Sequence, residues 1–168
     1  KLSTDLVIIE LAAVADLKSG DTILTHLEKP FTVLVPRATD FFSHGKRTSA
    51  PMMPKDIGMV IAYTGMSLRD RVLDAGTVSG IAAIFFGGIA DTVVTCEARE
   101  DFSKIAAGNI RDAGLSNVEC RACDVLDVTD GPFDVVHLDM MIEPWHVEHA
   151  YGLLRCGGCF ATYTPFLE

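Results

Sequence analysis

From residue 71 onward, short apolar runs alternate with longer stretches in which apolar residues recur at helical spacing. This alternation of strand-like and helix-like segments is typical of βαβ units around a parallel sheet. We therefore expect an α/β fold. The predicted strands are residues 71–75, 92–97, 117–123, 133–139 and 158–164. The predicted helices are residues 79–87, 99–113 and 144–154.

The first third of the chain has a different pattern. Pro54 opens a predicted helix over residues 54–64, because proline suits the first turn of a helix. Residues 1–45 contain short apolar runs broken by proline and glycine, which favours a small β-rich domain. Residues 6–17 are ambiguous, since their β-branched residues favour a strand while their leucines and valine recur at helical spacing. We divide the chain into a β-rich domain at 1–45 and an α/β domain at 46–168.

The turn after the strand at 71–75 carries candidate ligand chemistry. Its residues, Gly76-Thr77-Val78-Ser79-Gly80, lead into a helix, so backbone N–H groups are free to bind a polar or anionic ligand group. Glu97, at the end of the next predicted strand, suits ribose hydroxyls. A dinucleotide site would have three spaced glycines, whereas this chain has Val78 at the middle position. The pattern predicts a nucleotide-type cofactor site, and an ordinary strand-turn-helix crossing is the alternative.

The composition indicates a globular chain of 168 residues, 49% apolar and 22% charged, long enough for one core and a small appendage. No apolar run approaches the roughly 20 residues that span a bilayer, and the first residues lack a signal-peptide pattern. We therefore expect a soluble cytoplasmic protein with no membrane partner. Because the chain begins at Lys1 and stops at Glu168 just after an apolar strand, we expect residues to be missing from both ends.

The net charge of −9 is unevenly distributed. Residues 1–71 hold nine Lys or Arg against eight Asp or Glu, whereas residues 72–168 hold five against fifteen. Phosphate-rich partners bind basic patches, so a nucleic-acid contact is expected in the first half, where Lys46 and Arg47 lie. A solvated surface of mixed charge is the alternative.

Several short motifs together point to one family. The most specific is an acidic residue followed by Pro and Trp, Glu143-Pro144-Trp145, just after the predicted strand that ends at Asp139. The others are Lys46-Arg47, Pro54-Lys55-Asp56, Val72-Leu73-Asp74-Ala75-Gly76-Thr77 and Tyr163-Thr164-Pro165. From about residue 20 to its end, the chain resembles the tRNA (adenine-N1) methyltransferase family, particularly its archaeal and bacterial members.

This resemblance implies a Rossmann-like class I methyltransferase sheet with strand order 3-2-1-4-5-7-6 and helices on both faces. It implies that residues 1–45 are part of a small N-terminal β domain and that the last two strands of the sheet are missing. It also implies an S-adenosylmethionine-dependent enzyme that methylates N1 of an adenine in tRNA and assembles as a homotetramer.

The resemblance also implies roles for individual residues. Glu97 would bind the ribose hydroxyls of S-adenosylmethionine, and Asp124 would accept a hydrogen bond from its adenine amino group. Asp139, beside the cofactor, would be the catalytic carboxylate, because a carboxylate can orient the target adenine and take up developing positive charge. The residues that would pass beneath the methionine part of the cofactor are Gly76, Thr77, Val78, Ser79 and Gly80.

The substrate side would follow from the same motifs. Trp145 and either Met140 or Met141 could pack against an extruded base, since enzymes that modify a base must remove it from the stack. For Asp124 a turn-forming role, for Glu97 a surface position and for Trp145 a place in the core are the alternatives. The residues that would bind the substrate are Lys46, Arg47, Glu143, Pro144 and Trp145.

Two C-x-x-C pairs raise the question of zinc. Cys120 and Cys123 fall in a predicted strand, where an odd separation directs their side chains to opposite faces. Cys156 and Cys159 bracket a Gly-Gly turn before a strand four places away in the implied sheet order, roughly 19 Å at the usual strand spacing. Because zinc-bound sulfurs converge within about 4 Å, we expect buried thiols and no metal site.

Two other functions remain open. A protein isoaspartyl or corrin-type methyltransferase on the same fold would suit the net acidity of the chain. A non-catalytic tRNA-binding subunit would explain Val78, because a β-branched residue is poorly suited to a positive φ or to close approach by a ligand. The four carboxylates Asp74, Glu97, Asp124 and Asp139 favour a working site.

Overall fold

The computed structural model describes residues 2–3 and 8–164, which divide into two compact units between Pro36 and Arg37. Within the smaller unit, strand β1 (Leu2–Ser3) pairs antiparallel with β2 (Ile8–Ile9), and β3 (Thr22–Leu24) pairs antiparallel with β4 (Pro30–Thr32). A short 3-10 helix, η1 (Leu11–Ala13), follows β2. The ambiguous segment 6–17 thus contains both a strand and a helical turn, while its residues 6 and 7, like Pro165, lie outside the described residues.

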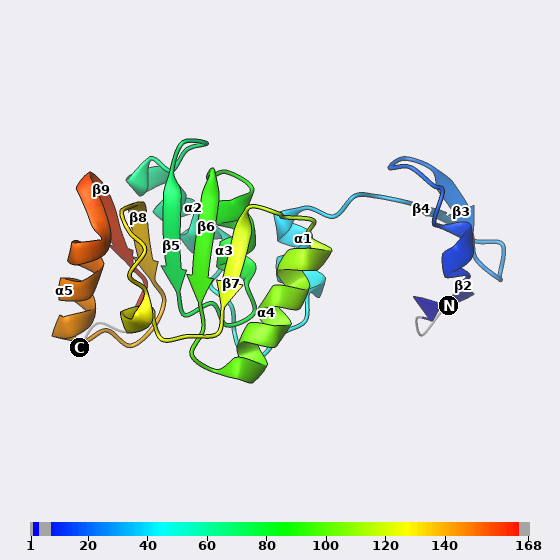
Figure 1. Ribbon diagram of the computed structural model, residues 1–168. Coiled ribbons are helices and arrows are strands. Elements are labelled where there is room, and N and C mark those ends of the chain that lie inside the picture. The colour runs from blue at the N-terminus through cyan, green and yellow to red at the C-terminus, as the bar shows by residue number, and fades with distance from the viewer. Residues whose placement is uncertain (1, 4–7, 165–168) are drawn as a thin grey trace. The chain divides into compact units, whose positions relative to one another are not determined.

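The larger unit is built on a five-stranded parallel sheet in the order β7-β6-β5-β8-β9 (Figure 1). This order is the 3-2-1-4-5 part of the expected topology, so the predicted fold class is confirmed. It also puts β7 and β9 at opposite edges, as expected for the strands of the two cysteine pairs. The strands are β5 (Arg71–Ala75), β6 (Thr92–Cys96), β7 (Val118–Arg121), β8 (Phe133–Leu138) and β9 (Leu154–Thr162).

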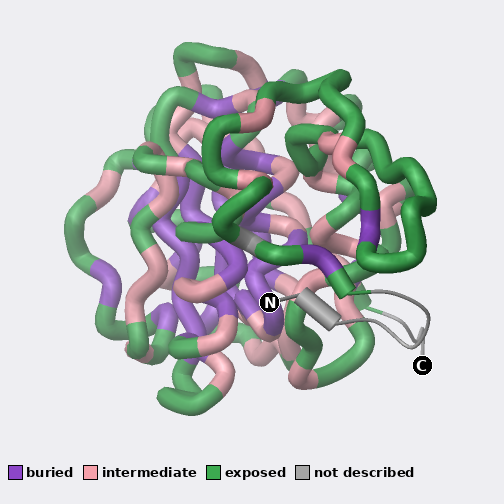
Figure 2. The backbone as a smooth tube through the Cα atoms, turned by 90° about the vertical axis from the view of Figure 1, so that its right-hand side faces the viewer, coloured by how far each residue is buried: buried purple, intermediate pink, exposed green. Residues whose placement is uncertain are grey.

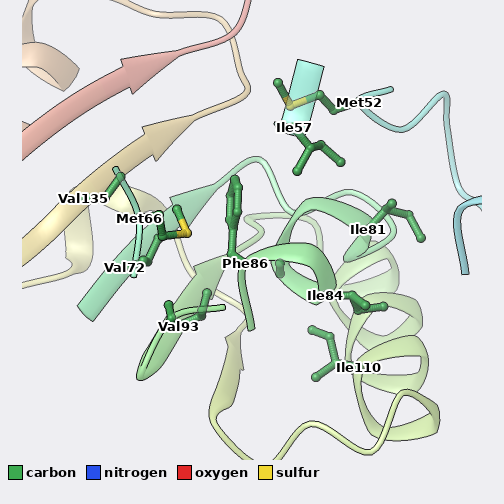
Figure 3. Close-up of a cluster of buried hydrophobic side chains, with 12 residues drawn as sticks. Met52, Ile57, Met66, Val72, Ile81, Ile84, Phe86, Val93, Ile110 and Val135 are labelled. Atoms are coloured by element: carbon green, nitrogen blue, oxygen red, sulfur yellow. The ribbon is translucent and has the colours of Figure 1, made fainter. Parts of the chain in front are cut away.

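Helices cover both faces of this sheet. In one buried cluster, helices α1, α2, α3 and α4 pack against alternate residues of β5, β6 and β8. In a second cluster, α5 and the 3-10 helix η2 pack against the residues in between, on the other face. Figure 3 shows the first cluster, which includes Phe86 and Ile84 of α3 and Val72 and Val93 of the sheet. Figure 2 colours the buried segments purple. The helices are α1 (Ala38–His44), α2 (Pro54–Thr64), α3 (Ile81–Gly87), α4 (Glu100–Asp112), η2 (Val125–Asp127) and α5 (Pro144–Leu153).

Two boundaries differ from the sequence prediction by more than two residues. The unit boundary lies at Pro36, before helix α1, because Phe41 and Phe42 of that helix pack against the core of the larger unit. Strand β9 begins at Leu154 rather than at residue 158. The predicted Gly-Gly turn is instead part of this strand, since Gly157 adopts φ 79° where the pairing with β8 shifts register.

No helix in residues 2–3 and 8–164 is long and apolar enough to cross a membrane.

Candidate active site

A cavity of about 400 Å³ opens where the carboxyl ends of β5, β6 and β8 meet the segment that follows β7. Its volume lies within the roughly 300–1,000 Å³ of small-molecule sites, and this end of the sheet is where open α/β folds bind ligands. Five of the predicted site residues line it, namely Gly76, Val78, Glu97, Asp124 and Asp139. The structure therefore brings together predicted residues that follow four different strands.

Gly76 lies in direct contact with the backbone of Asp139, the residue that follows β8. The N–H of Asp139 donates to the carbonyl of Ala75 at 2.8 Å. A Cβ added at Gly76, whose φ is 84°, would lie 2.0 Å from the carbonyl oxygen of Asp139. Only glycine fits this close approach, so the turn and the end of β8 form one continuous wall of the cavity.

Val78 adopts the left-handed conformation that its position requires, with φ 53°. Its N–H donates to Oε2 of Glu97 at 2.9 Å, which holds the turn against the end of β6. A β-branched residue in this region costs about 1–3 kcal/mol. Valine therefore does not prevent the turn from forming, but it stores strain beside the cavity.

We predict that Val78→Gly raises the free energy of unfolding by about 1 kcal/mol, because glycine adopts a positive φ without steric cost. Urea denaturation followed by circular dichroism measures the change. The matched control is Val147→Gly, an exposed valine of helix α5, where glycine should destabilise because it is a poor helix former. A loss of stability in Val78→Gly as large as in the control would contradict the prediction.

Glu97 is 4% exposed and forms hydrogen bonds with the turn and with Arg99. The guanidinium of Arg99 donates to both carboxylate oxygens, at 2.7 and 3.0 Å, and its backbone N–H donates at 3.1 Å. Burial opposes ionisation of Glu97, but the hydrogen bonds from Arg99 and Val78 outweigh it and hold the pKa of this carboxyl below its ordinary value. The cavity thus has an ionised acceptor at the end of β6.

Asp124 lies in the segment after β7, and its carboxylate accepts the N–H of Leu126 at 2.9 Å. This bond caps helix η2, so the turn-forming role is real. Asp124 is nevertheless exposed and lines the cavity. The two roles are compatible, because a carboxylate can accept several hydrogen bonds.

Asp139 follows directly after β8 and is partly buried. Burial raises its pKa to about 6, and the nearby charge of Asp74 adds to this shift. A carboxyl group with this pKa changes its protonation near neutral pH, as a general base or acid needs.

The other turn residues serve the scaffold. Thr77, Ser79 and Gly80 do not line the cavity. Ser79 is fully buried; its hydroxyl accepts the N–H of Thr48 at 3.1 Å, and its carbonyl accepts the side-chain amide of Asn109 at 2.8 Å. These bonds connect the segment before α2 with the turn at residues 76–80.

The five predicted substrate residues lie away from the cavity walls. Lys46 is exposed, and its backbone pairs with Asn109. Arg47 donates to the carbonyl of Phe42 and stacks its guanidinium over that ring at 5.2 Å.

Glu143 and Pro144 begin helix α5, with the N–H of Glu143 donating to Nδ1 of His146 at 2.9 Å. The side chain of Trp145 is 54% exposed, so the alternative reading of this residue as a core anchor is wrong.

Sequence reasoning missed part of the lining. Arg99 follows Glu97 by two residues, and this i, i+2 charge pair was the available signal. Cys96 and Cys123 also face the cavity with sulfurs 3.6 Å apart, which only the pairing of β6 with β7 reveals.

A second cavity of about 480 Å³ lies between α2 and β9. Its one carboxylate, Asp56, is engaged by Lys55 at 2.7 Å and lies 3.4 Å from the hydroxyl of Tyr163. It lacks the converging carboxylates that distinguish the first cavity.

A family model described as protein-L-isoaspartate(D-aspartate) O-methyltransferase matches residues 32–143, two thirds of the chain. The chain belongs to this methyltransferase family. The match includes β5 to β8 and therefore every residue that lines the cavity of the methyltransferase.

Named relatives confirm the resemblance to tRNA (adenine-N1) methyltransferases. A tRNA (adenine(57)-N(1)/adenine(58)-N(1))-methyltransferase from Methanocaldococcus jannaschii is 28% identical over 100% of this chain and 70% of its own length. A tRNA (adenine(58)-N(1))-methyltransferase from Thermus thermophilus is 30% identical over 87% of this chain and 60% of its own length. The chain thus spans about two thirds of these relatives.

The same fold occurs in a solved S-adenosylmethionine-dependent O-methyltransferase from Thermotoga maritima. That structure is 30% identical in sequence, covers 98% of this chain with a TM-score of 0.81, and is itself covered over 64% of its length. The comparison supports the class I methyltransferase fold over nearly the whole chain.

Proposed function

We propose that the protein is an S-adenosylmethionine-dependent methyltransferase that methylates N1 of an adenine in tRNA. One observation carries the proposal: Asp139, with a pKa of about 6, lines the same cavity as the glycine turn, Glu97 and Asp124. The two tRNA (adenine-N1) methyltransferases from Methanocaldococcus and Thermus support the choice of substrate.

The residues of the cavity fit the cofactor. Gly76 allows the turn to pack directly against the backbone of Asp139, so that both line the same cavity. Glu97 is an ionised acceptor suited to ribose hydroxyls, and Asp124 is suited to the amino group of an adenine ring. The bound cofactor would supply an electrophilic methyl group on a positively charged sulfur.

Asp139 would act on the target base. Methylation at N1 makes the adenine ring more positive, and an ionised carboxylate near the exocyclic amino group stabilises that charge and accepts the proton it releases. The partial burial of Asp139 strengthens this interaction, because electrostatic effects grow when water is excluded.

On the substrate side, Trp145 is 54% and Met141 is 84% exposed near the end of β8. We propose that they pack against the extruded adenine, with Glu143 and Pro144 holding the start of α5 in place. Lys46 and Arg47 would contact tRNA phosphates, since both side chains are exposed and basic. A cytoplasmic homotetramer is part of the same proposal.

A second candidate is methylation of isoaspartyl residues in proteins. The description of the matching family model and the net charge of −9 both favour it. A polyanionic tRNA requires basic contacts, whereas a peptide substrate does not.

The test begins with calorimetric titration of S-adenosylhomocysteine. Binding that falls by tenfold or more in Asp124→Ala, about 1.4 kcal/mol, would establish the cofactor site.

Transfer of labelled methyl groups to bulk tRNA and to an isoaspartyl peptide then distinguishes the two candidate substrates. Methylation of tRNA that is lost in Trp145→Ala but retained in Tyr151→Ala, an exposed aromatic of the same helix, supports the proposal. Methylation of the peptide alone overturns it.

A further inference from the structure

A row of buried polar side chains crosses the sheet one level below the cavity. Thr95 on β6, Asp74 on β5 and His137 on β8 are paired residues of neighbouring strands. Each is at most 1% exposed. They lie on the face that α3 covers, where the ring of Phe86 packs edge-on against His137 at 5.3 Å. Polar groups buried this deeply are costly unless they bond to one another.

Hydrogen bonds from both sides end on Asp74. The hydroxyl of Thr95 donates to Oδ2 at 2.6 Å, and Nδ1 of His137 lies 2.7 Å from Oδ1. An ionised carboxylate only accepts, so Nδ1 carries the hydrogen. Thr95 uses its one hydrogen on Asp74 and therefore accepts from the hydroxyl of Thr77, which lies 2.6 Å away.

The surroundings of the other ring nitrogen, Nε2, indicate the protonation state of His137. Nε2 is buried and has no hydrogen-bond partner among the described residues. A charged imidazole would place a second N–H there without an acceptor, so the geometry favours the neutral ring with its hydrogen on Nδ1. The hydrophobic wall formed by Phe86 is consistent with this assignment.

The two ends of the row reach both walls of the cavity. Thr77 lies between Gly76 and Val78 in the cofactor turn. His137 lies near the end of β8, two residues before Asp139, which lines the cavity. The interaction of Asp74 with its two donors therefore connects the turn that would lie under the cofactor with the segment that carries the catalytic carboxylate.

We propose that His137 is a positioning residue for the cofactor site. Its Nδ1–H holds the carboxylate of Asp74 in the orientation that accepts Thr95, and Thr95 in turn holds the hydroxyl of Thr77 beneath the turn. The role of His137 rests on the proposed function of the cavity as an S-adenosylmethionine site. Loss of the Nδ1–H frees Asp74 to rotate and releases the turn that the cofactor needs in one conformation.

Three substitutions of His137 separate this hydrogen bond from packing. His137→Asn keeps an N–H donor close to the position of Nδ1, His137→Gln moves the donor toward the position of Nε2, and His137→Leu removes it. In calorimetric titration with S-adenosylhomocysteine, we expect affinity to fall by about tenfold in the Leu and Gln variants and by less than about threefold in the Asn variant. Thermal melts of all three variants report folding separately.

A fourth variant tests the far end of the row. Thr77→Val removes the hydroxyl at nearly constant volume and leaves Asp74 with both of its donors, so the fold should persist. We expect affinity to fall by about threefold to tenfold. This variant keeps the proposal testable if His137→Leu does not fold.

The outcomes are distinct. Equal affinity in the Asn, Gln and unsubstituted proteins, or unchanged affinity in Thr77→Val, overturns the role of His137 and leaves the cofactor site intact. Absence of binding in the unsubstituted protein overturns the cofactor site, and the role of His137 with it. Restoration of affinity by Asn and not by Gln supports the proposal, because a role in packing alone would not distinguish the two amides.

Discussion

Asp139→Asn should lower the turnover number of methyl transfer by about 10²–10⁴, the usual contribution of a positioned acid or base. The amide keeps the shape of the side chain but cannot accept a proton. Single-turnover transfer of labelled methyl groups to tRNA measures the loss. Asp127→Asn, an exposed carboxylate of η2 that does not line the cavity, is the matched control and should leave the rate unchanged. Equal rates in the Asp139 variant and the control would rule out Asp139 as the catalytic group.

The pH dependence of the same reaction follows from the pKa of Asp139. Since the active form is the carboxylate, the rate should rise with pH through about 6 and level off above it.

The raised pKa of Asp139 also affects stability, because it disfavours the folded state in which this group is ionised. The contribution of Asp139 to stability is present below the ordinary pKa of 3.8 and is lost as pH rises through about 6. Asp139→Asn should therefore stabilise the protein at pH 7 by about 1 kcal/mol, after allowance for its partial exposure to solvent.

Gly76→Ala should destabilise the protein by at least about 3 kcal/mol, because both the positive φ and the contact are unfavourable for alanine. The added Cβ would lie 2.0 Å from the carbonyl oxygen of Asp139, and backbone on both sides would have to move. Urea denaturation measures the change.

Gly152→Ala in helix α5 is the control for the glycine substitution. No atom lies within 4 Å of the added Cβ there, so alanine should stabilise the helix by up to about 1 kcal/mol. A Gly76 variant as stable as the unsubstituted protein would show that the turn can move away from the end of β8 without cost. That result would contradict the description of the turn and the end of β8 as one continuous cavity wall.

Local sequence was sufficient to predict the bounds of an element where that element has clear start and end signals. The helix at 54–64 has Pro54 at its start and Gly65, with φ 66°, at its end, and its bounds are those predicted. The strand at 71–75 was also predicted at its observed bounds, and its Val72, Leu73 and Ala75 are buried, as expected for a central parallel strand. Strand β9 was the least accurate, since its glycines are typical of a turn and only pairing with β8 makes them a bulge.

The candidate site also contains residues that were predicted and features that only the structure decided. The strand-turn-helix pattern predicted Gly76 and Glu97, and the resemblance to tRNA (adenine-N1) methyltransferases added Asp124 and Asp139. The four residues line one cavity because the carboxyl ends of parallel strands meet at one edge of the sheet. Trp145 was located just after β8, but its exposure was undecided until the packing of α5 was known.

The sequence by itself determined the α/β class, the turn at residues 76–80 and the positions of Glu97 and Asp139 after their strands, since each depends on short-range periodicity or on a strand ending. Only the tertiary structure decided that His137 faces Asp74, because residues 63 positions apart meet through the register of β5 and β8. It also decided that the pKa of Asp139 rises to about 6. Burial and strand register arise from the packing of the whole sheet, so neither can be read from neighbouring residues in the chain.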